Sequence, residues 1–87
     1  MTHEEVKMMC EQHNAEVETY LRDILPEQIK AAGYPVENGM TTMGAWFAAQ
    51  RFINEQHFFD KGKLIMDAAR AAGFDVRMDM QNDTLVF

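Results

Sequence analysis

The segment from Thr42 to Phe58 constrains this chain most, because as a helix it would be apolar around most of its circumference. Only Arg51 and Glu55 clearly mark a side that faces solvent. Such a helix must be covered on most sides, yet the chain has only 87 residues to supply the cover. We therefore expect it to be either the central rod of the fold or part of a subunit interface. Its apolar stripes are Trp46, Ala49 and Ile53; Ala45, Phe52 and Phe59; and Phe47 with Phe58.

The N-terminal segment predicts a long amphipathic helix. Thr2 and Glu5 have the spacing of a capping box, and we expect the helix to run from about Thr2 to Leu25. Pro26 either kinks this helix or starts a short one, Pro26 to Ala32, with Gly33 as a left-handed cap. At about 100° per residue, the apolar face of the long helix carries Val6, Met9, Cys10, His13, Val17, Tyr20, Leu21 and Ile24.

The rest of the chain predicts turns, a third long helix and a C-terminal hairpin. Asn38-Gly39 is a two-residue turn signal for a small hairpin, and Thr42 is the expected cap of the aromatic helix. Residues 60–63 are expected to form a turn before a helix that ends at Ala72, with Gly73 as its cap. Residues 74–80 alternate apolar and charged, which predicts a half-buried strand. A turn at 81–83 then leads to a last strand at 84–87.

Two segments forty positions apart share one pattern, because residues 30–36 and 70–76 both read as a helix end, a glycine, an aromatic residue and an extended stretch. We attribute this echo to similar cap chemistry. The fold class predicted overall is mainly α (α+β), with about four helical segments and a short C-terminal antiparallel β-hairpin. We expect one small domain over residues 1–87.

Composition excludes several classes of protein. Eight basic residues stand against fourteen acidic ones, giving a net charge of −6, so we expect no binding to duplex nucleic acid. The chain has no serine, which excludes a serine nucleophile. A single cysteine excludes an internal disulfide framework and fits a reducing compartment. No apolar run is long enough for a membrane span and no secretory signal is evident, so we expect a cytoplasmic protein with no membrane contact.

One flank of the predicted first helix carries three side chains that could bind a metal or act in catalysis, namely His3, Cys10 and His13. One interpretation is a soft-metal site completed by His57 or by a second subunit. The alternative is a core cysteine with a histidine at its margin, since cysteine is among the most often buried residues. Cys10 lies mid-helix among acids, which does not lower a thiol pKa. We predict no metal, no cofactor and no enzymatic activity.

The acidic residues concentrate at the N-terminus, where residues 1–27 hold seven acids and two bases. A solvated helix face explains many such runs, but an acidic face also steers binding to a basic partner. We predict that Glu4, Glu11 and Glu18, with Met8, bind a protein that is basic or itself binds nucleic acid. The expected function is that of a stoichiometric inhibitor or a phage-like counter-defence or immunity-type factor. Its predicted homo-oligomer interface comprises Trp46, Phe47, Ile53 and Phe58.

An alternative function is suggested by the stretch Asp60-Lys61-Gly62-Lys63, if it precedes a helix. Exposed amides at a helix start favour anions, and two lysines add positive charge. In this interpretation Lys61, Gly62 and Lys63 bind an anionic metabolite or a nucleotide-like ligand, and the protein sequesters it.

Overall fold

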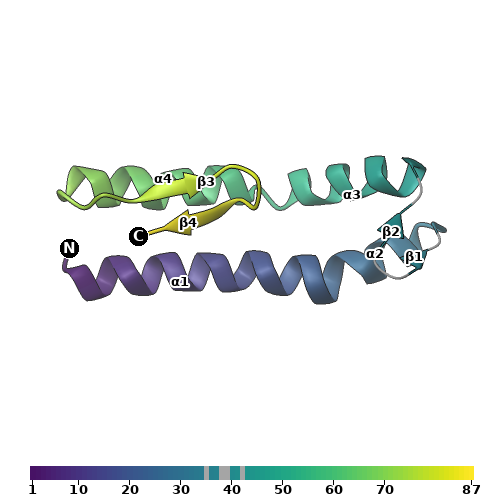
Figure 1. Cartoon of the computed structure of the whole chain (residues 1–87), viewed down its shortest axis with the longest axis horizontal. Coiled ribbons are helices and arrows are strands. Elements are labelled where there is room, and N and C mark those ends of the chain that lie inside the picture. Colours follow the sequence, from purple (N-terminus) through teal and green to yellow (C-terminus); the bar gives the residue numbers. More distant parts are fainter. Residues whose placement is uncertain (35, 38–39, 42) are drawn as a thin grey trace. The chain divides into compact units, whose positions relative to one another are not determined.

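The sequence folds mainly into helices, with two short hairpins between and after them (Figure 1). The computed structural model describes residues 1–34, 36–37, 40–41 and 43–87. The predicted fold class is confirmed, because the helices are followed by a C-terminal two-stranded antiparallel hairpin. The elements are α1 (His3–Thr19), the π-helical turn η1 (Tyr20–Ile24), α2 (Leu25–Ala31), β1 (Val36–Glu37), β2 (Met40–Thr41), α3 (Met43–Glu55), α4 (Phe58–Ala71), β3 (Arg77–Asp79) and β4 (Thr84–Val86).

The chain divides into two compact units. The first unit comprises Met1–Glu18 and Phe58–Phe87, and the second unit comprises Thr19–His57. The expectation of a single domain stays a prediction. The first unit contains ten acidic and five basic residues, whereas the second contains four and three, so most of the net negative charge belongs to the first unit.

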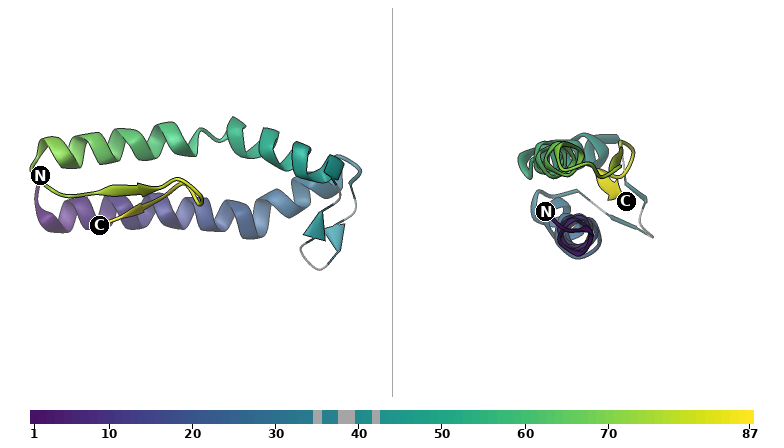
Figure 2. Two further views of the ribbon diagram at one scale, coloured as in Figure 1. Left: turned by 45° about the horizontal axis from the view of Figure 1, so that its top comes forward. Right: turned by 90° about the vertical axis from the view of Figure 1, so that its left-hand side faces the viewer.

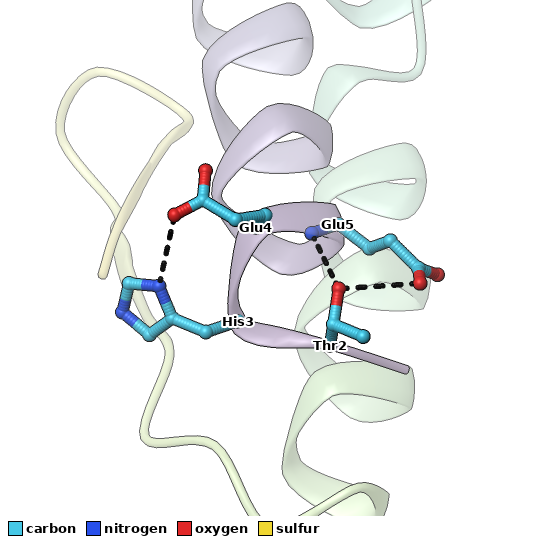
Figure 3. Close-up of polar contacts among 4 residues, drawn as sticks. All are labelled: Thr2, His3, Glu4 and Glu5. Atoms are coloured by element: carbon cyan, nitrogen blue, oxygen red, sulfur yellow. Dashed lines mark hydrogen bonds and ion pairs between the residues drawn. The ribbon is translucent and has the colours of Figure 1, made fainter.

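The predicted capping box forms in part at the start of α1 (Figure 3): Thr2 caps the helix, but the Glu5 carboxylate accepts from the Thr2 hydroxyl instead of the Thr2 amide. The Glu5 amide donates to Thr2 Oγ1 at 3.2 Å, and the Thr2 hydroxyl donates to Glu5 Oε1 at 3.2 Å. In the same turn, His3 Nδ1 lies 3.8 Å from Glu4 Oε1. Glu4 and Glu5 also place negative charge at the positive end of the helix dipole.

Gly33 and Gly73 end α2 and α4 in the same way, with φ of +90° and +93°. In both, the amide of the residue after the glycine donates to the carbonyl five residues earlier. The amide of the glycine itself donates to the carbonyl three residues earlier, and the two bonds together form the Schellman motif. The two segments therefore share the predicted cap chemistry. The bonds are Tyr34 N to Ile29 O, Gly33 N to Lys30 O, Phe74 N to Ala69 O and Gly73 N to Arg70 O.

Before Pro26 the helix widens into a π-turn, in which the Leu25 amide donates to the Tyr20 carbonyl five residues back. Proline has no amide hydrogen and clashes with the preceding turn, which interrupts the α-helical hydrogen-bond pattern. The wider turn accommodates this interruption. The buried positions consequently jump from Tyr20 to Leu25. Leu21 and Ile24 were expected on the apolar face, but both are exposed. That prediction is wrong because α-helical spacing does not hold across a π-turn.

The aromatic helix ends earlier than predicted, at Glu55 rather than near Phe58. The Gln56 and His57 amides each donate three residues back, which tightens the last turn. His57 then takes a left-handed φ of +56°, which stops the helix. α4 begins at the next residue, Phe58, so residues 60–63 lie inside α4. The predicted turn at these residues is wrong.

In the second unit, β1 and β2 pair antiparallel, with Val36 opposite Thr41. The predicted Asn38-Gly39 turn and the predicted Thr42 cap lie outside the described residues.

Tyr20 joins the helices of the second unit, where α2 packs against both η1 and α3. Its hydroxyl donates to Gln28 Oε1 on α2. Burial and the nearby Glu55 carboxylate raise the pKa of the Tyr20 phenol, which keeps this donor protonated. At the other end of α3, a Cβ on Gly44 would lie 3.1 Å from the Tyr34 ring. The absence of a side chain there lets the ring approach the first turn of α3.

The first unit packs the C-terminal hairpin beside α1 and α4 (Figure 2). Met78 lies opposite Leu85 in the register, and the turn that joins the strands contains Asp83 in a left-handed conformation. The strands are shorter than predicted, and the predicted alternation holds only from Phe74 to Met78, because Asp79 is half-buried and Met80 is exposed. Val76 and, on β4, Leu85 are buried. The core of this unit is Val6, Cys10, Ala69, Val76 and Leu85.

Asn14 of α1 closes the outer edge of β4. Its Nδ2 donates to the Leu85 carbonyl at 2.8 Å, and its Oδ1 accepts from the Leu85 amide at 2.7 Å. On the other side, Arg70 Nε of α4 donates to the Val76 carbonyl at 3.0 Å. A lone two-stranded hairpin is marginal in water, so these contacts, together with the buried Val76 and Leu85, hold it in place.

Replacing Asn14 tests this clamp. Asn14→Ala leaves both backbone groups of Leu85 without a partner, and we expect it to lower the free energy of unfolding by about 1–3 kcal/mol. Asn14→Asp keeps the acceptor for the Leu85 amide but loses the donor, so it should also destabilise. Urea unfolding followed by circular dichroism measures both. Gln12→Ala, an exposed site on the same helix, is the control, and equal stability of Asn14→Ala and Gln12→Ala would contradict the clamp.

Candidate functional site

A surface pocket of about 190 Å³ lies in the first unit, between α1 and α4. Gln12 and Asn14 are two positions apart and therefore project from opposite flanks of α1. The hairpin occupies the flank of Asn14, and the pocket opens on the flank of Gln12. Its lining combines apolar side chains with one acid and one base, namely Met9, Gln12, His13, Glu16, Lys61 and Ile65.

His13 forms the inner wall of this pocket and is only 3% exposed. Its Nε2 donates to the Asp83 carbonyl in the hairpin turn at 2.8 Å. The ring also faces Phe58 edge-on, with the ring centroids 6.3 Å apart. A Cβ on Gly62 would lie 3.0 Å from His13 Nε2 and 2.9 Å from Met78 Cε. The missing side chain of Gly62 thus makes room for a buried imidazole that joins α1 to the hairpin.

Gly62→Ala tests this packing. Helix propensity alone predicts a gain of about 1 kcal/mol for alanine, but the new methyl group would collide with His13 and Met78. We expect a net loss of about 1–3 kcal/mol in the free energy of unfolding. In a Met78→Ala background the penalty should shrink, because one of the two collisions is gone. A Gly62→Ala chain that is more stable than the parent in thermal and urea unfolding would refute the packing role.

The predicted anion site is not assembled as expected. Lys61, Gly62 and Lys63 lie inside α4 instead of preceding it, and Gly62 is buried against His13. Residues two positions apart in a helix do not face each other, so the two lysines cannot converge on one anion. Lys61 Nζ lies 5.8 Å from the centre of the Phe58 ring and lines the pocket. Binding of an anion beside Lys61 stays a prediction.

The predicted partner-binding residues form a continuous exposed stripe on α1, which we call the acidic stripe. Glu4, Met8, Glu11 and Glu18 recur every three, four or seven residues, which places them on one side of the helix. All four are exposed. In the described part of the chain, neither Glu11 nor Glu18 forms an ion pair with a basic side chain. At Glu11 and Glu18 the stripe therefore presents negative charge that no ion pair of the described residues neutralises.

The predicted oligomer interface is divided by the structure. Trp46 and Phe47 near the start of α3 are 51% and 62% exposed, and their rings meet edge-on with centroids 5.1 Å apart. Ile53 is half-buried on the same helix. Phe58 is only 5% exposed and belongs to α4, where it contacts His13. Phe58 therefore has no surface to offer a second subunit, and we remove it from the predicted interface.

The candidate metal ligands of the first helix have separate surroundings. The His3 ring contacts the Phe87 ring at a tilt with centroids 4.7 Å apart, Cys10 is buried in the core, and His13 bonds to Asp83. Over the residues that the structure describes, no group of three or more His, Cys, Asp or Glu side chains is arranged to hold a metal ion. Burial, and secondarily the charge of Glu11, raises the pKa of the Cys10 thiol. This environment opposes a reactive thiolate.

The raised pKa of Cys10 predicts slow modification of the folded chain. A disulfide reagent such as Ellman's should react slowly with the native protein and rapidly in urea, where the thiol is exposed and titrates normally. Because the pKa of Cys10 is raised in the folded state, the protonated thiol contributes to the free energy of unfolding at neutral pH. This contribution is lost as the pH rises above the ordinary thiol range. Equal reaction rates in the native and urea-unfolded chains would contradict the buried placement.

Sequence reasoning missed Gln12, His13, Glu16, Lys61 and Ile65 as neighbours in one pocket. The one available signal was a glycine between two lysines in a helix-compatible stretch, because a glycine inside a helical pattern often marks close packing. Because a glycine between polar residues is also typical of a turn, the sequence predicts a turn there instead.

No helix in the described residues combines the length and apolar character that crossing a bilayer requires. No protein-family model matches the chain, and no curated protein or solved structure matches it significantly.

Proposed function

We propose that this chain is a small, non-enzymatic protein-interaction module that self-associates through the aromatic surface of α3. The observation that carries the proposal is the exposed pair Trp46–Phe47. Tryptophan and other aromatic residues are enriched at protein interfaces, and tryptophan is among the commonest hot-spot residues. Two adjacent exposed rings on one helix offer a large apolar contact area with few rotatable bonds.

The acidic stripe supports the second part of the proposal, which is binding to a larger basic protein. Glu11 and Glu18 are exposed without ion-pair partners in the described residues, and Met8, one turn before Glu11, is 57% exposed. Exposed acids accelerate and orient the approach of a basic surface, and a flexible thioether adapts to an irregular one. A small acidic chain of this design suits a cytoplasmic stoichiometric inhibitor or a counter-defence or immunity-type factor.

The pocket does not favour the alternative of nucleotide sequestration. Sites for drug-sized ligands and cofactors usually enclose about 300–1,000 Å³, whereas this pocket has about 190 Å³. Glu16 also lines it and would repel a phosphate.

Self-association is tested by measuring the mass in solution over a wide range of concentration with light scattering. We expect a multiple of 10.0 kDa that dissociates on dilution. The double variant Trp46→Ala/Phe47→Ala should remain folded, because both side chains are largely exposed, and should be monomeric. Met80→Ala, which also removes an exposed apolar side chain, is the matched control. A wild-type chain that is monomeric at every concentration would refute self-association.

Binding to a basic partner is tested by affinity capture from a lysate of the source cells, with captured proteins identified by mass spectrometry. The triple variant Glu4→Lys/Glu11→Lys/Glu18→Lys should lose the partner, and high salt should release it from the wild type. A control with equal net charge is Glu27→Lys/Asp67→Lys/Asp75→Lys, which leaves the stripe intact. If both triple variants capture the same proteins as the wild type, the stripe has no role in binding.

A further inference from the structure

We infer that the pocket of the first unit receives the Phe47 side chain of a second copy of this chain. This inference rests on the proposed self-association and names its contact: an aromatic side chain of α3 enters the groove between α1 and α4 of a partner molecule. It assigns a role to the pocket residues that the proposed function leaves unused.

The size of the pocket fits a single aromatic ring. An engineered apolar cavity of about 150 Å³ binds benzene, and the pocket has about 190 Å³. Met9 and Ile65 are half-buried apolar side chains of its lining. Methionine adapts its shape to the group that it contacts and interacts favourably with aromatic rings. The pocket therefore offers an apolar surface for a phenyl group and too little space for a nucleotide.

Phe47 is suited to enter it. Its side chain is 62% exposed, and the Trp46 ring contacts it edge-on and limits its orientations. Arg51 follows one helical turn later, so Phe47 and Arg51 project from the same side of α3. Any pocket that accepts Phe47 must therefore also accommodate a cation beside it.

Glu16 supplies the matching charge. It is exposed at the pocket and pairs with no basic side chain in the described part of the chain. Arg51 forms an ion pair with Glu55 at 4.0 Å with both side chains largely exposed, an interaction of small value. An Arg51–Glu16 contact between two molecules would bring together a cation and an acid that are both weakly engaged.

The overall charges also favour this pairing of unlike surfaces. Two first units facing each other would oppose surfaces that each contain ten acids and five bases. Docking the second unit of one molecule on the first unit of another avoids most of this repulsion, because the second unit contains four acids and three bases. Two such contacts related by a twofold axis would close a dimer.

A charge exchange between molecules tests the contact. Glu16→Arg and Arg51→Glu should each weaken self-association about tenfold or more, because each juxtaposes like charges at the pocket. An equimolar mixture of the two variants should recover affinity, since the cation introduced by Glu16→Arg in one molecule then meets the acid introduced by Arg51→Glu in the other. Dissociation constants come from sedimentation velocity, and circular dichroism verifies folding. Asp67→Arg, an exposed acid of α4 outside the pocket, is the control and should associate like the wild type.

A second pair of variants isolates the ring. Phe47→Ala removes the inserted side chain, whereas Gln12→Trp fills the pocket from an exposed position. Each alone should self-associate at least about tenfold more weakly, and the mixture should form a heterodimer through Phe47 of one chain and the open pocket of the other. If the wild type associates but Glu16→Arg and Gln12→Trp associate equally well, the pocket is overturned as the receptor while self-association through α3 stands. A monomeric wild type overturns both.

Discussion

The first unit depends on a polar contact made by a buried side chain, the bond from the His13 imidazole to the Asp83 carbonyl. A buried polar group is costly unless it is hydrogen-bonded, so the ring fixes where the hairpin turn must lie. The ring in turn needs the space that Gly62 leaves on α4. Three segments distant in sequence thereby meet at one imidazole, and the outer side of the same ring becomes the wall of the pocket. The His13 ring therefore determines both the packing of the unit and the shape of the pocket.

Features decided by neighbouring residues could be predicted from the sequence. The helix cap at Thr2, the glycine caps at Gly33 and Gly73 and the alternating strand before Met80 each follow from hydrogen-bonding or side-chain geometry within a few residues. The exposure of the acidic stripe could be predicted in the same way, because charged residues on the side of a helix opposite its apolar face point into solvent.

Features decided by distant partners, or by local departures from the regular α-helical repeat, could not be predicted. Gly62 resembles a turn residue until His13, forty-nine positions earlier, is known to pack on it. His57 ends the aromatic helix with a left-handed backbone, which is uncommon for any residue other than glycine, and Phe58 therefore begins the next helix. The π-turn before Pro26 shifts every later buried position by one residue, which a constant helical period cannot anticipate. The pocket is lined by residues of α1 and α4 that lie far apart in the sequence, so no local pattern could reveal it.

The bidentate contact of Asn14 with Leu85 has a consequence for the behaviour of the chain at high concentration. The outer edge of a strand usually presents free amides and carbonyls, which can template the addition of strands from other molecules and so begin aggregation. At Leu85 both groups are already occupied by a side chain that imitates a neighbouring strand. A carboxamide on a helix cannot propagate a sheet, so β4 is sealed at this position against growth. The proposed association through exposed rings would therefore not compete with strand addition at this position of β4.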